Sequence, residues 1–119
     1  MLRQGEPSPA LLRFEGYERA ARGLEESKAA ARRLSMDSRR DALLEDVGRE
    51  AALDAAWEEV GEVACGLDRL AASVLASHFL WLMPWEEAAA SNGIAIDKAK
   101  KLAYGALEWL DAGGEDNDD

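Results

Sequence analysis

The fold of this chain is decided by residues 67–110, LDRLAASVLASHFLWLMPWEEAAASNGIAIDKAKKLAYGALEWL. This stretch contains an apolar run at helical spacing, a short acidic segment that begins near Pro84, the pair Asn92 and Gly93, and an amphipathic run from about Asp97. Glycine adopts a positive φ angle without steric cost, so Gly93 can redirect the chain sharply between two helices. The order of these parts predicts a helix-turn-helix over residues 67–112.

The run that follows Gly93 has two different faces. Its apolar residues recur at helical spacing on one side, at Ala99, Leu102, Ala106, Leu107 and Leu110. Asp97 is expected to accept backbone N–H groups at the start of this helix. Lys98, Lys100 and Lys101 fall on the other faces, where they could meet phosphates or base edges. Three lysines also suit a solvated helix surface, and it is the preceding turn that favours contact with DNA.

Two long helices are expected before this stretch. The first runs from Ala10 to about Leu34 and has an apolar seam of Phe14, Tyr17, Ala21, Leu24 and Ala31, which Lys28 weakens. The second runs from about Asp41 to Cys65 and is expected to turn toward the first its apolar residues Leu44, Val47, Ala51, Trp57, Val60 and Ala64. Its acidic residues are expected to face water, namely Asp41, Glu45, Asp46, Glu58, Glu59 and Glu62. A short break at residues 36–38 predicts an antiparallel hairpin over residues 10–66, which could serve for self-association.

Several residues mark where the expected elements begin and end. Ser8 or Pro9 is a suitable start for the first helix, after a flexible leader over residues 1–9. Asp68 is a suitable N-cap for the helix that follows the hairpin. The pair Gly113 and Gly114 is expected to end the last helix and to leave a disordered acidic tail over residues 113–119. The sequence therefore predicts an all-α fold.

The composition favours a binding role over a catalytic one. Cys65 is the only cysteine and His78 the only histidine, so neither an internal disulfide nor a Cys/His metal cluster is expected. Glu86 and Glu87 are adjacent on a helix and do not face each other as a catalytic pair would. The longest apolar run, residues 79–85, is far shorter than the roughly 20 residues that cross a membrane. We expect a cytoplasmic protein without cofactor, metal or enzymatic activity.

The net charge of −10 counts against a nucleic-acid partner, since affinity for DNA comes largely from neutralising phosphates. The charge is unevenly distributed, however. Residues 111–119 contain five acidic residues and no basic one, so half of the negative excess is expected in the tail. The hairpin tip is expected to carry Arg32, Arg33, Arg39 and Arg40, which could contact a second stretch of phosphates. The alternative, which we favour, is that Arg32 and Arg33 offset the dipole at the C-terminal end of the first helix. All four tryptophans are expected in the core, at positions 57, 81, 85 and 109.

Residues 67–110 resemble the fourth conserved region of sigma-70 factors, in the form found in small phage-encoded ArpU/RinA-like transcriptional regulators. The shared pattern is a leucine-bearing helix, an aromatic-leucine pair, Trp-Glu-Glu, a glycine turn, basic residues and an Ala-Leu pair. Here it is carried by Leu70, Val74-Leu75, Phe79-Leu80, Trp85-Glu86-Glu87, Ala89, Gly93-Ile94, Lys98, Lys100-Lys101-Leu102 and Ala106-Leu107. The spacing matches without a gap over about forty residues.

This resemblance implies a recognition helix that enters the major groove of DNA. By matching position it implies that promoter bases are met by Ile96, Asp97, Lys98 and Lys101, with Lys100 on phosphate. Five positions depart from the family pattern. Pro84 and Ala95 replace capping hydroxyl residues, Leu82 replaces a turn glycine, and two further groove positions hold Ile96 and Gly105.

The leading expectation is a phage or prophage transcriptional regulator that binds duplex DNA in a sequence-specific manner, with the hairpin used for homodimer formation. One alternative is a protein-interaction module in which Ile96 and acidic surfaces dock a partner such as RNA polymerase. Another is a helical structural protein that assembles through its first two helices. Salt dependence separates the first two, because DNA binding through lysines weakens steeply as salt rises.

Overall fold

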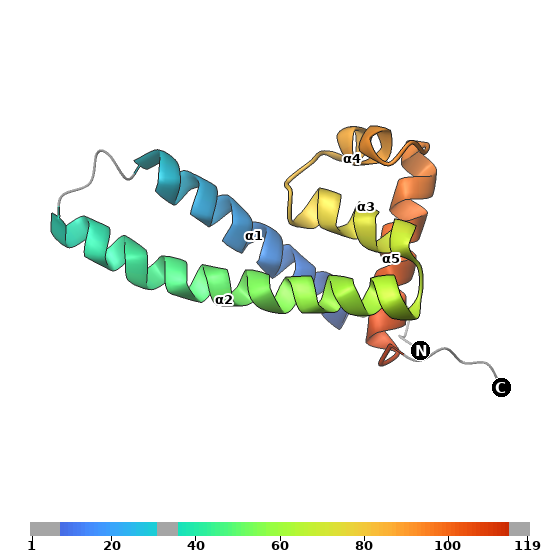
Figure 1. Ribbon diagram of the computed structural model, residues 1–119, viewed down its shortest axis with the longest axis horizontal. Helices are drawn as coiled ribbons and strands as arrows, with labels where there is room; N and C mark the ends of the chain where they lie inside the picture. The colour runs from blue at the N-terminus through green and yellow to red at the C-terminus, as the bar shows by residue number, and fades with distance from the viewer. Residues whose placement is uncertain (1–7, 31–35, 115–119) are drawn as a thin grey trace.

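The structure, a computed structural model, describes residues 8–30 and 36–114, with residues 36–42 described by their backbone only. These residues form five helices and no strand, which confirms the all-α fold (Figure 1). In chain order the helices are α1 (Pro9–Ala30), α2 (Met36–Gly66), α3 (Arg69–Phe79), α4 (Trp85–Ser91) and α5 (Ile96–Asp111). The leader before residue 8, the side chains of the four arginines near the hairpin tip and the tail beyond residue 114 lie outside the described residues.

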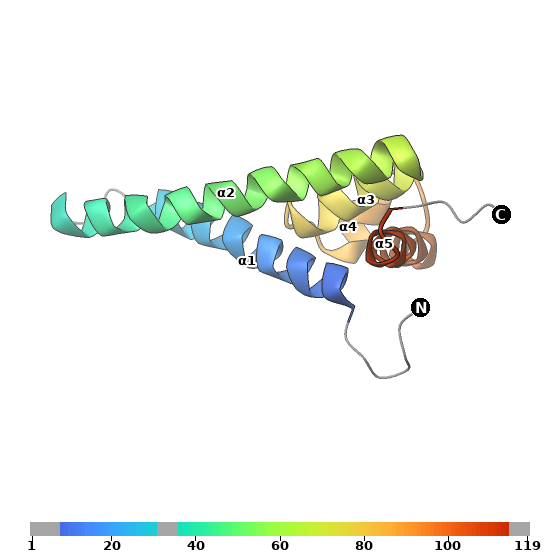
Figure 2. The same cartoon turned by 90° about the horizontal axis from the view of Figure 1, so that it is seen from below.

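Helices α1 and α2 lie side by side and run in opposite directions, while α3, α4 and α5 gather at one end of this pair (Figures 1 and 2). The expected start of the second long helix was wrong, because α2 begins at Met36 rather than near Asp41. Helix α1 is described as far as Ala30, so its expected end near Leu34 lies outside the described residues. Residues 36–38, expected as a break, belong to α2, since Asp and Ser suit the first turn of a helix as well as the cap before it.

The face that α2 turns inward differs from the expected one. Ala56, Val60 and Val63 are buried there, and Leu53 packs against them, whereas Leu44 is 69% exposed and Val47 is 65% exposed. Residues 53, 56, 60 and 63 also follow helical spacing, so periodicity alone allows either face. Docking of α1 and α3 selects the set nearer the C-terminal end of α2, and only Val60 and the half-buried Ala64 of the expected set share in the contact.

Glu59 was also expected to face water and does not. Its carboxylate accepts hydrogen bonds from the Tyr17 hydroxyl at 2.6 Å and from two nitrogens of Arg13, and its side chain is only 17% exposed. Burial and the bond to Glu59 raise the pKa of Tyr17 to about 12, and the same carboxylate raises the pKa of Arg13. The α1–α2 contact therefore contains a polar group of three residues beside its apolar side chains.

The core lies where α3 meets α1, α2 and α5. Phe14 of α1 is fully buried, and its ring meets Phe79 of α3 edge-on at 5.7 Å. Much of the remaining core is alanine, with Ala71, Ala72 and Ala76 on α3 and Ala99, Ala103 and Ala106 on α5. Small side chains let helix backbones approach closely, so α5 packs tightly beside α3, and Figure 2 shows it almost end-on.

Two capping arrangements join the ends of the helices. Asp68 accepts the N–H groups of Leu70 and Ala71, both at 3.3 Å, which confirms it as the N-cap of α3. At the start of α1, Ser8 accepts the N–H of Leu11 at 3.0 Å and donates its own hydroxyl proton to Asp111. Asp111 also accepts the N–H of Ala10 at 2.8 Å, so the last residue of α5 holds the first turn of α1.

Two of the four tryptophans lie outside the core, contrary to expectation. Trp57 is 43% exposed and Trp81 is 65% exposed, whereas Trp85 and Trp109 are partly buried against the core. Trp57 lies outside the core because it stands beside the inward face of α2 rather than within it. Over the described ranges, no helix combines the length and the apolar character needed to cross a membrane.

Candidate nucleic-acid interface

The chain turns sharply between α3 and α4. The N–H groups of Leu80 and Trp81 both donate to the carbonyl of Ala76 at 2.9 Å, and Leu82 then adopts a φ angle of +60°. Leucine in this left-handed conformation costs about 1–2 kcal/mol. Residue 82 therefore has a backbone conformation that glycine would adopt without this cost.

The turn between α4 and α5 is a Schellman motif. The N–H of Ile94 donates to the carbonyl of Ala89 and the N–H of Gly93 to that of Ala90, both at 3.1 Å. Gly93 has a φ angle of +68°, which confirms the positive φ expected from the sequence. Ile94 then packs against the core and anchors the chain before α5 begins.

Asn92 ties this turn to α3. Its side-chain amide donates to the carbonyl of Ala88 at 2.7 Å and to the hydroxyl of Ser77 at 3.4 Å, and its side-chain oxygen accepts from Ser73 at 2.6 Å. From the sequence, Asn92 was identified only as the residue that precedes the turn glycine Gly93. The signal that could have revealed its role is the pair of serines at positions 73 and 77, four residues apart on a helix that is otherwise apolar.

A series of aromatic rings joins α4 to α3 and α5. The His78 ring stacks on Trp85 with centroids 3.7 Å apart, and His78 Nδ1 lies 2.7 Å from the carbonyl oxygen of Met83. Tyr104 of α5 extends the series, with its ring 5.8 Å from that of Trp85. His78 is therefore a packing residue that positions α4 relative to α3.

Helix α5 begins one residue earlier than expected and without a side-chain cap. Ala95 is the N-cap and has extended φ and ψ angles, so Asp97 already lies inside the first turn. The expectation that Asp97 caps the helix was wrong. The Schellman turn ends at Ile94, so the next residue, Ala95, occupies the N-cap position. The carboxylate of Asp97 still lies where a negative charge interacts favourably with the helix dipole.

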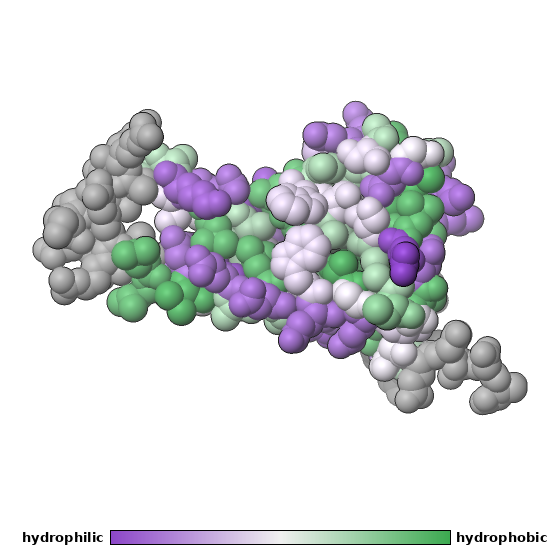
Figure 3. Space-filling model, in the orientation of Figure 1, coloured by the Kyte–Doolittle hydropathy of each residue, from purple (hydrophilic) through white to green (hydrophobic). Residues whose placement is uncertain are grey.

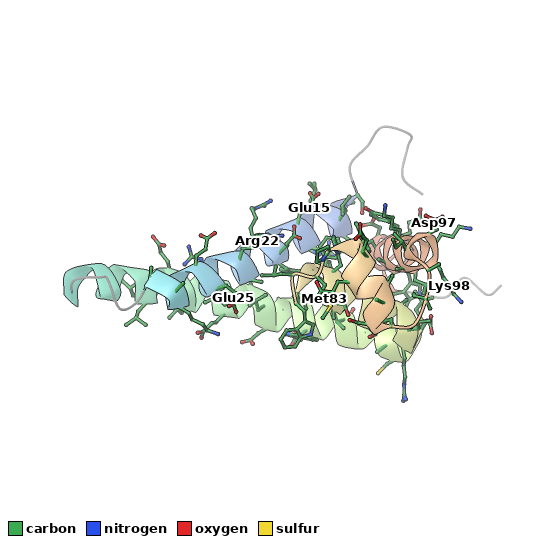
Figure 4. All side chains as sticks on the ribbon, turned by 90° about the horizontal axis from the view of Figure 1, so that it is seen from above. Glu15, Arg22, Glu25, Met83, Asp97 and Lys98 are labelled. Atoms are coloured by element: carbon green, nitrogen blue, oxygen red, sulfur yellow. The ribbon has the colours of Figure 1, made fainter. Side chains whose placement is uncertain are left out.

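The five residues expected at the DNA interface all lie at the exposed start of α5. Ile96 is 39% exposed, and Asp97, Lys98, Lys100 and Lys101 are exposed as well. The opposite face of the helix is buried at Ala99, Ala103, Ala106 and Leu107. Asp97 and Lys98 project from α5 away from the other helices (Figure 4). In the part of the chain that the structure describes, none of the three lysines takes part in an ion pair.

Tyr104 belongs to the same surface, although sequence reasoning did not single it out. It is 44% exposed and follows Lys100 and Lys101 by about one helical turn, so it shares their face. A phenol beside lysines can donate to a phosphate oxygen or stack on a sugar. We define the α5 face as Ile96, Asp97, Lys98, Lys100, Lys101 and Tyr104.

The charge of the α5 face is positive, but its surroundings are acidic. Residues 96–104 contain three lysines and one aspartate. Glu86 and Glu87 are exposed in the first turn of α4, and Glu108 is exposed one turn beyond Tyr104. Within the described ranges, no group of three His, Cys, Asp or Glu side chains is arranged to hold a metal ion.

No protein family model, curated protein or solved structure matches this chain. The functional argument therefore depends on the geometry of the α4–turn–α5 unit and on the chemistry of the α5 face.

Proposed function

We propose that the protein binds duplex DNA through the α5 face and acts as a transcriptional regulator of the phage or prophage type, in the cytoplasm, in a binding rather than a catalytic role. The observation that carries the proposal is a set of three exposed lysines that form no ion pair with any other described residue, on the first turns of a helix that follows a Schellman turn. A helix presented in this way can enter the major groove with its N-terminal residues toward the bases.

The roles of the residues follow from their place on the helix. Lys98 and Lys101 lie three residues apart on one exposed side, and they are proposed to reach base edges together with Ile96 and Asp97. Lys100 lies on a neighbouring side and is proposed to contact phosphate. Asn92 supports this arrangement because it fixes the turn to α3.

The number of lysines limits the electrostatic contribution. With about three phosphates neutralised, a plot of log affinity against log salt concentration should have a slope of roughly −3. A steeper slope would require basic residues outside the α5 face. The negative charge elsewhere makes tight non-specific binding unfavourable, so binding must depend on the fit of α5 to a groove.

The test is an electrophoretic titration with genomic DNA fragments at two salt concentrations. Lys98→Ala combined with Lys101→Ala should weaken binding by about tenfold or more, because two charged contacts of about 1 kcal/mol each are removed. The matched control is Arg19→Ala combined with Lys28→Ala, which also removes two exposed positive charges, but from α1. Equal weakening by both pairs, or undiminished binding by the first, would refute the proposal.

A second function is favoured by the apolar part of the same face. Ile96 and Tyr104 are both exposed large side chains, and they could dock a protein such as an RNA polymerase subunit with little contact to DNA. Binding of that kind should be nearly indifferent to salt and should be lost in Ile96→Ser. A homodimer through the N-terminal helices is proposed in either case, and the exposed Leu43, Leu44 and Val47 of α2 support it.

A further inference from the structure

A second surface lies away from the α5 face, where the connection between α3 and α4 meets the two long helices. It is a hollow of about 280 Å³, and apolar side chains of all three elements line it, chiefly Leu24 of α1, Leu53 and Trp57 of α2, and Leu80 and Trp81 at the end of α3. We call it the tryptophan groove. Figure 3 shows apolar surface between α1 and α2 and hydrophilic residues along the edge of α2.

The two tryptophans of the groove contact each other and remain open to solvent. Their rings meet at an angle of 64° with centroids 6.0 Å apart, and Trp81 is 65% exposed. One exposed apolar side chain needs no explanation, but two touching tryptophans beside an apolar hollow form a continuous patch. Tryptophan in such a setting is the residue most often responsible for affinity between proteins.

The edge of the groove on α2 is acidic. Asp54 and Glu50 lie about one and two turns before Trp57 on the same side of the helix, Glu58 is adjacent to it, and all three are exposed. Residues 50–66 contain five acidic residues and no lysine or arginine. The α1 edge carries Glu25 and Lys28, which form an exposed ion pair with 3.9 Å between Lys28 Nζ and Glu25 Oε1. These two residues together contribute no net charge to the groove.

This distribution of charge restricts what can cover the groove. DNA is excluded, because phosphates would meet the carboxylates of α2. A second copy that brought its own α1 to the groove is disfavoured, because the described part of α1 has as many acidic as basic residues and offers no excess of positive charge to the carboxylates of α2. A complementary surface must combine apolar side chains with several positive charges.

We propose that the tryptophan groove docks an amphipathic helix of a partner protein, with leucine-like side chains in the hollow and lysine or arginine residues against Glu50, Asp54 and Glu58. Helical ligands of this kind place apolar anchors at positions i, i+3 or i+4 and i+7 in a groove between helices. Glu25 on α1 and Lys98 on α5 lie far apart in Figure 4, so the groove can be occupied while the α5 face is engaged. The proposal does not depend on DNA binding.

The experiment uses the full chain and synthetic 14-residue peptides that lack tryptophan. The probe has leucine at positions i, i+3, i+4 and i+7 and lysine at most others, and two further peptides replace lysine by glutamate or leucine by serine. Binding is followed by the anisotropy of a labelled peptide and by the protein's tryptophan emission. Circular dichroism of each variant verifies that its helical content is unchanged.

The leucine–lysine peptide should bind and shift the tryptophan emission to shorter wavelength. Trp81→Ala should weaken it by about tenfold or more, whereas Tyr104→Ala, which removes an exposed aromatic ring of the α5 face, should have no effect. The double variant Glu50→Lys and Asp54→Lys should bind the leucine–glutamate peptide in its place.

Four results would overturn the proposal. These are absence of binding, equal binding of the serine–lysine peptide, binding that Trp81→Ala leaves unchanged, and a concentration-dependent dimer in sedimentation that shields the tryptophans without peptide. The last result would assign the groove to a second copy of the chain.

Discussion

The two ends of the molecule are held together by different means. At the end that contains α3, α4 and α5, Val74, Leu75 and Leu107 are almost fully buried, and alanines let the helices approach closely. Toward the other end, where α1 and α2 run on alone, Leu43 and Leu44 are largely exposed. The contacts there are polar, such as the bond of 2.8 Å from the Ser27 hydroxyl to Asp46.

This difference indicates how stability is distributed. Exposed ion pairs such as that of Arg49 with Glu45, at 3.3 Å, contribute at most about 1 kcal/mol each. A buried leucine or phenylalanine contributes several times more. The far part of the α1–α2 pair should therefore open first, while the bundle that presents the α5 face stays folded.

The largest expected effect comes from the residue that joins the two regions. Phe14 is fully buried in α1 and touches Phe79 of α3, so Phe14→Ala should lower the free energy of unfolding by about 3–5 kcal/mol. At protein concentrations too low for the proposed dimer, the control Leu44→Ala removes a side chain that is 69% exposed and should change the value by less than about 0.5 kcal/mol. Urea denaturation followed by circular dichroism measures both.

A small loss for Phe14→Ala would show that the hairpin and the bundle are only loosely coupled. A large loss for Leu44→Ala would show instead that the far end is covered in solution, for example by a second copy. Either outcome would break the contrast between the two ends.

The next effect lies within the bundle. Gly93 has a φ angle of +68° and free space for a Cβ atom, so Gly93→Ala tests the backbone conformation alone and should cost about 1–2 kcal/mol. Gly105 also has free space but lies inside α5, so Gly105→Ala should stabilise the protein by about 0.5–1 kcal/mol. Thermal unfolding of the two variants should therefore move in opposite directions from wild type, and a shift in the same direction would contradict this account of the turn.

Much of the bundle could be predicted from the sequence because its signals are local. A capping aspartate at residue 68, a helix starting after Pro84 and a positive φ at Gly93 each follow from the chemistry of one or two residues. The inward face of α2 could not be predicted, because two sets of apolar residues on it share the same period and only α1 and α3 decide between them.

The candidate site was predictable only in part, for a similar reason. The exposure of Lys98, Lys100 and Lys101 follows from the period of the apolar residues of α5. The clamp formed by Asn92 and the stack of His78 on Trp85 join residues from different helices, and no local pattern specifies which polar or aromatic residues will meet. The tryptophan groove was missed because a large aromatic residue is ordinarily assigned to the core.

The smallest expected effect lies in the polar contact between α1 and α2. The Tyr17 hydroxyl donates to Glu59, and Tyr17→Phe should cost about 1 kcal/mol at neutral pH. Burial and this bond raise the pKa of Tyr17 from 10.0 to about 12, so the folded state retains a proton that the unfolded state has already lost between these values. The stability contributed by Tyr17 is thus fully present below about pH 10 and is lost as the pH rises to about 12.

Urea titrations from pH 8 to pH 12, with Tyr104→Phe as the matched control, measure the gap in the free energy of unfolding between wild type and Tyr17→Phe. This gap should close between about pH 10 and pH 12. A gap that stays constant would mean that the Tyr17–Glu59 bond does not form in solution, and that the other contacts between α1 and α2 hold the two helices together.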